Sequence, residues 1–500
     1  MTGGLMRMSK NHELMLEKAN ESIEKVKDIV KYSKYRQRYH FMAPAYWMND
    51  PVGLIQYKGK YHLFYQHYPY APHWGSMHWG HAVSSDLVHW EHLPIALAPS
   101  EEYDYHERGG CFSGSAIEDN GVLYLFYTAT TNYGSGFIQT QCLATSTDGI
   151  HFNKYKGNPI INEPPVSGSS DFRDPKVWKY EDAWYMVIGS SRDKRGKALL
   201  YKSFNLYEWN YVGVLAESRG ELGTMWECPD FFHLGQKGVL MFSPMNLGDR
   251  KAVYLVGDMD YKTGKLFWSS IGEVDWGFDC YAVQSFLDNK GRRIIIGWAN
   301  SWDWMPWWRG FGPPASENWS GSLTLPRTVE LCPDGKLKFA PIEELVSLRY
   351  DYNTMSDIII KENKRLPVRA GDGISYEIIA DFDLTKSTAS SFGFALRCSE
   401  TEETLLECDI SSGELVFDRT HSDNWSEGIR RCPLESASKD SIRLHIFVDT
   451  CSVEVFTDDG RTVMSCNIYP SEKSTGIYIY SRNGSVKLSN LETWGLSSIW

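Results

Sequence analysis

The sequence predicts an all-β protein, a five-bladed β-propeller followed by a β-sandwich domain, with a short N-terminal helix. Two independent landmarks recur along the first part of the chain. Aromatic or aliphatic β-runs begin at Gly59, Gly121, Asp182, Gly238 and Arg292, which are 62, 61, 56 and 54 residues apart. Aromatic residues that follow a second strand stand at Trp90, Phe152, Trp209 and Phe267, at spacings of 62, 57 and 58. Several short strands per unit at this period are typical of propeller blades.

Flanking segments differ from the repeats. Apolar residues at helical spacing among Glu and Lys predict one amphipathic helix between about residues 10 and 33. After the fifth repeat come short strands of alternating polarity, two of them joined by the turn Asp458-Asp459-Gly460, which favours a sandwich. We therefore expect a helical leader over residues 1–36, the propeller over 37–341, a linker over 342–365 and the β-sandwich over 366–500.

Composition excludes several classes of partner. The 500 residues include 51 basic and 63 acidic side chains, and the net charge of -12 disfavours nucleic acid and anionic membranes. No apolar stretch approaches the roughly 20 residues that span a bilayer, and we see no signal peptide, so we expect a cytoplasmic protein. The sequence leaves self-association into a homo-oligomer open.

Cofactor-dependent chemistry finds no support in the sequence. The ten cysteines lack metal-type pairing and are expected to be reduced and buried. Seven histidines fall between His62 and His92, but their spacing matches no ligand motif, so we expect no metal. There is also no Gly-rich phosphate loop and no Gly-x-Ser-x-Gly elbow. We expect no cofactor.

Three carboxyl groups stand in phase with the repeat. Asp50, Asp174 and Glu227 precede the β-runs of the first, third and fourth units by 9, 8 and 11 residues. An acidic residue shortly before a proline is more often part of a simple turn. However, the first strand of each blade lines the central channel of a propeller, so residues at this place meet at one end of it. The sequence predicts an acidic axial site.

Paired carboxyl groups of opposite role are what glycoside hydrolysis requires. We expect Asp50 to stay ionised near the amide of Asn49, and Glu227 to keep its proton among less polar neighbours. Arg173 adjoins Asp174, which we expect to remain ionised and to oppose the positive charge of an oxocarbenium-like transition state.

Tryptophans are concentrated in the fifth unit. A platform that stacks on sugar rings is the favoured interpretation, and ordinary packing is the alternative. The cluster consists of Trp298, Trp302, Trp304, Trp307 and Trp308.

Six ordered motifs give the chain a resemblance to glycoside hydrolase family 32, the invertases, fructanases and sucrose-6-phosphate hydrolases. They are Trp47-Met48-Asn49-Asp50-Pro51, Phe112-Ser113-Gly114-Ser115, Arg173-Asp174-Pro175-Lys176, Glu227-Cys228-Pro229-Asp230, Phe278-Asp279-Cys280-Tyr281-Ala282 and Leu323-Thr324-Leu325-Pro326-Arg327. The resemblance implies a five-bladed propeller with a β-sandwich. It also implies that Asp50 is the nucleophile, Glu227 the acid/base and Asp174 the transition-state stabiliser. Residues expected around the fructosyl unit are Trp47, Asn49, Gln66, Trp74, Phe112, Ser113, Arg173, Tyr281 and Trp298.

By this resemblance the function would be that of a retaining β-fructofuranosidase. Its substrates would be sucrose, sucrose 6-phosphate or short β-fructans, cleaved through a fructosyl-enzyme intermediate. Fructosyl transfer and, from another class, non-catalytic fructan binding are the alternatives. The leader and the stretch from Met77 to Ser84 look most like the bacterial intracellular sucrose-6-phosphate hydrolases. One departure is Val52, where the family usually has Asn, and it removes an amide next to the nucleophile.

Overall fold

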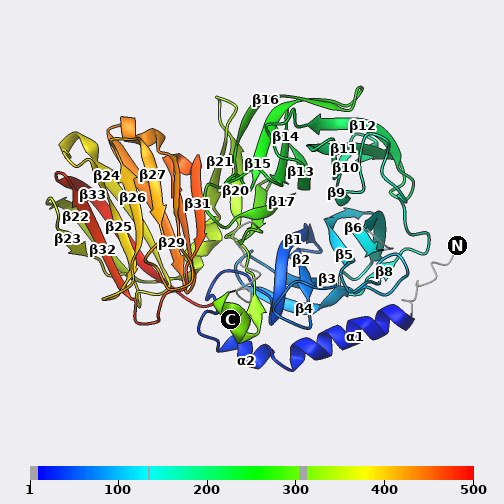
Figure 1. Cartoon of the computed structure of the whole chain (residues 1–500), viewed down its shortest axis with the longest axis horizontal. Helices are drawn as coiled ribbons and strands as arrows, with labels where there is room; N and C mark the ends of the chain where they lie inside the picture. Colours follow the sequence, from blue (N-terminus) through cyan, green and yellow to red (C-terminus); the bar gives the residue numbers. More distant parts are fainter. Residues whose placement is uncertain (1–9, 133–135, 303–311) are drawn as a thin grey trace.

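Two β-domains lie side by side in the computed structural model, which describes residues 10–132, 136–302 and 312–500 (Figure 1). Five sheets make up the larger domain. The first contains β1 (Tyr46–Tyr57), β2 (Lys60–Tyr68), β3 (His78–Ser84) and β4 (Trp90–Leu97). The second contains β5 (Gly110–Asp119), β6 (Val122–Asn132), β7 (Phe137–Ser146) and β8 (Asn153–Lys154).

The remaining three sheets follow the same meander. The third contains β9 (Phe172–Tyr180), β10 (Ala183–Arg192), β11 (Arg195–Ser203) and β12 (Asn210–Glu217). The fourth contains β13 (Trp226–Leu234), β14 (Lys237–Pro244), β15 (Val253–Asp260) and β16 (Lys265–Glu273). The fifth contains β17 (Tyr281–Leu287), β18 (Arg293–Trp298), β20 (Arg327–Leu331) and β21 (Leu337–Pro341).

Contacts between the first strands of the sheets close a ring. β1 contacts β5, β5 contacts β9, β9 contacts β13, β13 contacts β17 and β17 returns to β1. In addition β19 (Trp319–Ser320), which comes from the end of the domain, pairs in parallel with β1 and fastens the last blade to the first. The predicted five-bladed propeller is confirmed. The repeated β-runs are the second strand of each blade. In each of the first four blades, the aromatic residue of the other landmark lies within the outermost strand or directly before it.

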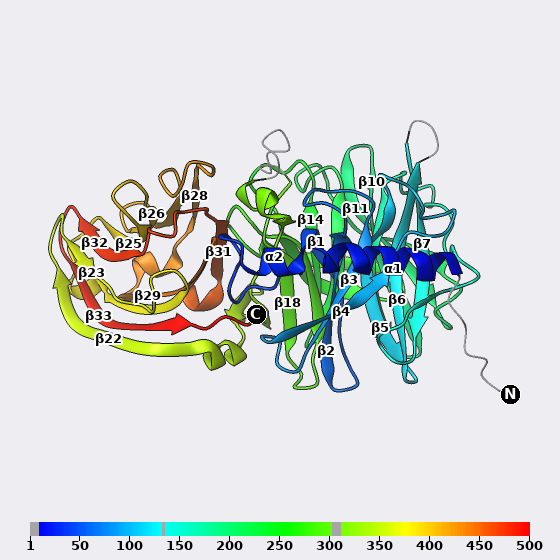
Figure 2. The same cartoon turned by 90° about the horizontal axis from the view of Figure 1, so that it is seen from below.

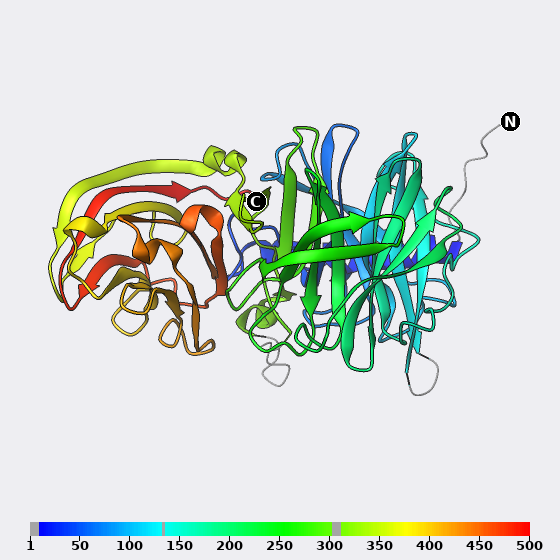
Figure 3. The same cartoon turned by 90° about the horizontal axis from the view of Figure 1, so that it is seen from above.

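The smaller domain is the predicted β-sandwich, whose two six-stranded sheets face each other in Figure 3. One sheet has the order β22 (Arg349–Ile360), β33 (Val486–Leu496), β24 (Tyr376–Asp383), β29 (Ser441–Asp449), β30 (Ser452–Thr457) and β31 (Thr462–Asn467). The other has the order β23 (Arg365–Pro367), β32 (Gly476–Arg482), β25 (Ser391–Cys398), β26 (Thr404–Asp409), β27 (Glu414–Asp418) and β28 (Ile429–Pro433). The apolar core between the sheets includes Phe382, Phe392 and Ile446. Short 3₁₀ turns are η2 (Pro313–Glu317), η3 (Glu343–Leu348), η4 (Leu384–Lys386), η5 (Glu435–Ser438) and η6 (Asp458–Gly460).

Much of the range expected to be a linker is a strand. β22 lies within residues 342–365 and pairs along its length with β33. It is an edge strand whose side chains are mostly exposed, so its sequence has little of the buried alternation that marks a strand. The domain boundaries as a set stay a prediction.

The N-terminal leader runs along the propeller in Figure 2. It forms two helices, α1 (Lys10–Glu24) and α2 (Lys27–Lys31), where one was expected, and the break carries no Gly or Pro. α1 packs on β4, with Ala19 fully buried and Asn20 Oδ1 accepting a hydrogen bond from the backbone of Ile95 at 3.0 Å. No helix in the described ranges is long and apolar enough to span a membrane.

A buried ionic network joins the two domains. The Arg327 guanidinium of the fifth blade contacts Asp275 at 2.9 Å and Glu454 of the sandwich at 2.7 Å. His40, which precedes the first blade, contacts Asp449 at 2.9 Å and Glu454 at 3.2 Å. These contacts fix the sandwich against the propeller. All ten cysteines are free and buried, as predicted.

Candidate active site

Each of the five innermost strands shifts register within its first residues. The shifts lie between residues 48 and 51, 112 and 114, 173 and 176, 227 and 230, and 281 and 284. Such a β-bulge turns a side chain away from the direction that regular pleating would give it. Asp174, Cys228 and Ala282 have positive φ values of 66°, 49° and 51°, which is uncommon for residues other than glycine. The repeated bulge therefore shapes one end of the channel.

Asp50 lies in the first of these bulges and is 8 % exposed. Its Oδ2 accepts a hydrogen bond from Ser113 Oγ at 2.6 Å and faces the thiol of Cys228 at 3.5 Å. Its Oδ1 is buried and forms no hydrogen bond within the described part of the chain. Burial raises the pKa of Asp50 to about 6, with hydrogen bonds opposing the rise and the charge of Glu227 adding to it. Ser113 thus holds one oxygen, and the other is buried without a partner in the described part of the chain.

Asp174 is linked to Asp50 through Cys228. The backbone N–H of Cys228 donates to Asp174 Oδ2 at 2.8 Å, while its thiol faces Asp50. The Asp174 N–H in turn donates to Thr128 Oγ1 at 2.9 Å. Burial raises the pKa of Asp174 to about 7; Arg173 opposes this rise, and the charges of Glu227 and Asp50 add to it. Burial thus works against the expected ionisation of Asp174, and the charge of Arg173 supports it.

Glu227 has charged and polar partners. Its Oε1 accepts hydrogen bonds from Arg173 Nη2 at 3.0 Å and Nε at 3.2 Å, and its Oε2 accepts from the Tyr281 hydroxyl. Burial and the charge of Glu227 hold the pKa of Tyr281 well above its usual value, so this hydroxyl keeps its proton. The expectation of less polar surroundings is wrong because the partners of Glu227 come from the third and fifth blades and not from its neighbours in the sequence. Trp226 stacks on Phe242 in the blade core.

The guanidinium of Arg173 forms ion pairs with Glu227 and Asp171. Its charge lowers the pKa of the adjoining Asp174. Arg173 reaches across to the fourth blade and so connects β9 with β13. Its pKa is raised because the neighbouring carboxylates outweigh the effect of burial.

The predicted aromatic residues form one cluster beside the carboxylates. Trp47 lies 5.9 Å from Trp298 and 6.0 Å from Trp302, measured between ring centroids. Trp74 and Phe112, both half-buried, meet edge to face at 6.1 Å. The other cluster members include Met77, Cys228, Tyr281 and Ala282. The predicted tryptophans Trp304, Trp307 and Trp308 lie outside the described residues.

Two predicted polar residues have internal partners. Asn49 Oδ1 accepts a hydrogen bond from Trp47 Nε1 at 2.8 Å. Gln66 Nε2 donates to the carbonyl of Cys111 at 2.9 Å, across to the second blade. Gln66 stands opposite the bulge that contains Asn49 and Asp50, since Met48 pairs with His67 and Pro51 with Tyr65. Both side chains hold the bulge in place.

Val52 lies away from the carboxylates. It is fully buried in the apolar cluster that contains Phe64 and Trp79 between the first two blades. A residue in this packing environment contributes apolar contact. Val52 therefore belongs to the apolar core beside the bulge that contains Asp50.

Some contributors to the site were not predicted. Cys228 joins Asp50 to Asp174, and its place within the Glu227-Cys228-Pro229-Asp230 motif was the only available signal. Thr128 lies in the middle of β6 and belongs to none of the six sequence motifs, so no sequence signal marked it. Among the described residues, no group of three His, Cys, Asp or Glu side chains is arranged to hold a metal ion.

Comparison with known proteins gives consistent matches over nearly the whole chain. The family model of the glycosyl hydrolases family 32 N-terminal domain matches residues 40–341, and that of the family 32 C-terminal domain matches residues 344–495. A sucrose-6-phosphate hydrolase from Zymomonas mobilis is 39 % identical, covering 96 % of each chain. A sucrose-6-phosphate hydrolase from Escherichia coli is 41 % identical, covering 92 % of this chain and 94 % of its own. The solved family 32 β-fructofuranosidase from Bombyx mori superposes with a TM-score of 0.81 at 34 % identity, covering 97 % of this chain and 99 % of its own.

Proposed function

Because the chain belongs to glycoside hydrolase family 32, we propose that it is a retaining β-fructofuranosidase that hydrolyses the fructosyl bond of sucrose and sucrose 6-phosphate. One observation carries the mechanism. Asp50, Asp174 and Glu227 come from three blades and are linked around Cys228, and one buried oxygen of Asp50 has no hydrogen-bond partner among the described residues. A double displacement at an anomeric carbon requires a carboxylate nucleophile and a carboxyl group that acts as acid and base.

In the first step Asp50 Oδ1 attacks the anomeric carbon of the fructosyl unit. The Ser113 hydroxyl holds the other oxygen, so the carboxylate is oriented before substrate arrives. Glu227 gives its proton to the glycosidic oxygen as that bond breaks, and the glucosyl part leaves as an alcohol. A covalent fructosyl-Asp50 ester remains.

In the second step water takes the place of the leaving alcohol. Glu227, now a carboxylate, accepts a proton from the water as it attacks the anomeric carbon, and the ester bond to Asp50 breaks. Arg173 and Tyr281 fix the direction of the Glu227 carboxyl group through both steps. Fructose is released with its original anomeric configuration.

Asp174 has a different role from the other two. Its carboxyl group accepts a hydrogen bond from the Cys228 backbone and retains capacity to bind sugar hydroxyls. In its ionised form it opposes the positive charge that develops on the fructosyl ring in both transition states. The aromatic cluster around Trp47 and Trp298 supplies apolar surface and excludes water from the reacting carbon.

The rival functions predict different products. Fructosyl transfer would yield oligosaccharides, and non-catalytic fructan binding would give a complex without turnover. The presence of all three carboxylates supports catalysis. We propose to assay sucrose, sucrose 6-phosphate, 1-kestose, inulin and levan side by side, following fructose release and its anomeric form by NMR. Initial release of β-fructofuranose supports the proposal. Immediate appearance of the other anomer, or oligosaccharides as the main product, would overturn it.

The proposed cellular location is the cytoplasm. The support is the match to bacterial sucrose-6-phosphate hydrolases, since the negatively charged 6-phosphate substrate does not cross membranes unaided. Fractionation of the host cells with an antibody to the chain tests this proposal. Self-association stays an open prediction that light scattering tests.

A further inference from the structure

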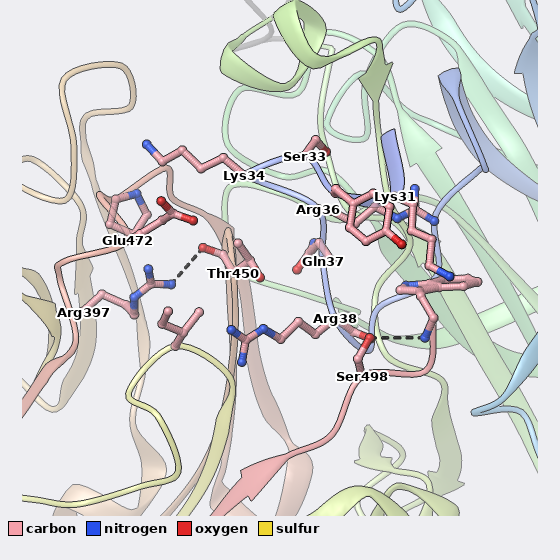
Figure 4. Close-up of a pocket in the computed structure, with 14 residues that line it drawn as sticks. Lys31, Ser33, Lys34, Arg36, Gln37, Arg38, Arg397, Thr450, Glu472 and Ser498 are labelled. Atoms are coloured by element: carbon pink, nitrogen blue, oxygen red, sulfur yellow. Dashed lines mark hydrogen bonds between the residues drawn. The ribbon is translucent and has the colours of Figure 1, made fainter. Parts of the chain in front are cut away.

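A polar cavity of about 300 Å³ lies where the leader meets the sandwich (Figure 4). One wall is the chain segment from Lys31, the last residue of α2, to Arg38. The opposite wall comes from Arg397 of β25 and from the loops that carry Thr450 and Glu472. Ser498 and Trp500, near the end of the chain, also line the cavity. None of the predicted active-site residues lines this cavity.

The lining is strongly cationic in a chain whose net charge is -12. It contains five basic side chains and one acidic side chain, Glu472. Of the five, Arg38 alone forms an ion pair with a described carboxylate, that of Asp372. Lys34 Nζ donates to the hydroxyl of Tyr35 at 2.7 Å, which carries no charge to balance it. The basic residues are Lys31, Lys34, Arg36, Arg38 and Arg397.

Two of the arginines are held by neutral partners. Arg397 is 1 % exposed, and its Nε and Nη1 donate to the carbonyls of Ser474 and Thr450, both at 2.8 Å. Arg36 donates to the carbonyl of Ala43 at 2.8 Å, and its guanidinium stacks over the ring of Trp500 at 4.9 Å. Burial lowers the pKa of both side chains. A buried cation without a paired anion is costly, so an incoming anion would be stabilised here.

We propose that this cavity binds the phosphate group of a small phosphate monoester or inorganic phosphate. Planar guanidinium groups and ammonium groups from two walls are the donors that phosphate oxygens require. The volume lies at the lower end of that of small-molecule sites. A bound phosphate would connect Lys34 of the leader and Arg38, which lies just after the leader, with Arg397 of the sandwich. This inference does not depend on the proposed function.

Isothermal titration calorimetry on the full chain, at constant ionic strength, tests the proposal. The titrants are inorganic phosphate, fructose 6-phosphate and uncharged fructose. The test variant is Lys34→Ala with Arg38→Gln. The matched control is Lys364→Ala with Arg365→Gln, which likewise removes an exposed lysine and an arginine that is paired with a carboxylate, here Glu403 at 2.8 Å.

The expected result is saturable phosphate binding that weakens about tenfold or more in the test variant and stays unchanged in the control. Tighter binding of fructose 6-phosphate than of phosphate would show that the sugar is recognised as well. Equal affinities would identify the phosphate alone as the ligand. Fructose binding and the rate of sucrose hydrolysis are expected to be the same in all three proteins, which checks the fold and the carboxylate site.

Two results would overturn the proposal. One is the absence of saturable phosphate binding to the unmodified chain, which would mean that salt screens the charge of the basic cluster and that the cluster forms no phosphate site. The other is an equal loss of binding in the test and control variants, which would assign the effect to overall charge. Fructose 6-phosphate binding that is identical in all three proteins would place this ligand at the carboxylates.

Discussion

Ser113 donates a hydrogen bond to Oδ2 of Asp50 at 2.6 Å and thereby links the bulges of the first two blades. Oδ1 of the same carboxyl group forms no hydrogen bond with the described residues. The two oxygens of Asp50 thus differ in their surroundings: a neighbouring blade anchors one, and the other is buried without a hydrogen-bond partner in the described ranges.

Ser113→Ala should lower kcat by about 10- to 100-fold, because Asp50 loses an orienting donor that favours its ionised form. The pKa of Asp50, already raised to about 6, should rise further. The acidic limb of the pH–rate profile should therefore move to higher pH. Measuring kcat/KM over about four pH units centred near the pKa of Asp50 checks this. A lower kcat with an unmoved limb would assign Ser113 to packing alone.

Asp50→Asn should abolish turnover, with a loss on the order of 10⁴ or more in rate, because the amide is not a nucleophile. It should also stabilise the fold at neutral pH. The folded-state pKa of Asp50 is about 6, above the usual 3.8, so its stabilising contribution is present below 3.8 and is lost as pH rises through 6. Above that pH, removing the charge should raise the free energy of unfolding by roughly 2 to 3 kcal/mol.

Thermal unfolding of Asp50→Asn at pH 4 and pH 8 measures this gain. The exposed turn residue Asp182, changed to Asn, is the control and should shift the unfolding temperature little at either pH. A gain of the same size at both pH values would show that desolvation of the Asp50 charge is not the cause.

The sequence predicted the blades because their second strands repeat a buried pattern at one period. It also placed the three carboxylates, since each stands in phase with that pattern. It could not predict the bulges at Asp174 and Cys228, because the positive φ values of these residues follow from tertiary contacts and not from Gly or Asn. The partner of Arg173 was missed for a related reason: proximity along a strand says little about which neighbouring blade a side chain reaches.

Arg327→Met should destabilise the assembly of the two domains by about 3 to 5 kcal/mol, because it leaves Asp275 buried without its cation and Glu454 paired with His40 alone. Arg327 is 1 % exposed, so water cannot replace it. Calorimetry should show a lower unfolding temperature and separate transitions for propeller and sandwich. The exposed Arg443, which pairs with Asp381, is the control and should cost less than about 1 kcal/mol when changed to Met. Equal effects of the two changes would contradict a role for the network.

His40 should make stability depend on pH in the alkaline range. Burial opposes its charge, but hydrogen bonds to Asp449 and Glu454 outweigh burial and raise the pKa of His40 to about 9. Its contribution is therefore complete below the ordinary value of 6.5 and is lost as pH rises through 9. The unfolding temperature of the unmodified chain should fall over this pH range, and that of His40→Gln should fall less. Parallel curves for the two proteins would mean that His40 does not titrate there.

Glu227→Gln tests acid catalysis at the group that Arg173 and Tyr281 hold in place. The amide keeps the shape of the side chain but cannot give a proton to the glycosidic oxygen. With sucrose, whose leaving alkoxide needs that proton, kcat should fall by about 10² to 10⁴. An aryl β-fructofuranoside has a good leaving group, so formation of its fructosyl-enzyme should be much less affected. Arg173→Lys serves as the control, because it disturbs the orientation of Glu227 while leaving its proton in place.

Azide then separates acid/base catalysis from sugar binding. In the Glu227→Gln variant the second step lacks a general base, and the fructosyl-enzyme should accumulate. Azide is an anionic nucleophile that needs no base, so it should restore turnover of the aryl substrate and give fructosyl azide with retained configuration. The alkaline limb of the pH–rate profile should also disappear, since it reports loss of the proton of the acid. Equal losses on both substrates, an unchanged limb and no response to azide would together mean that Glu227 only positions the sugar, and the proton would have to come from another group.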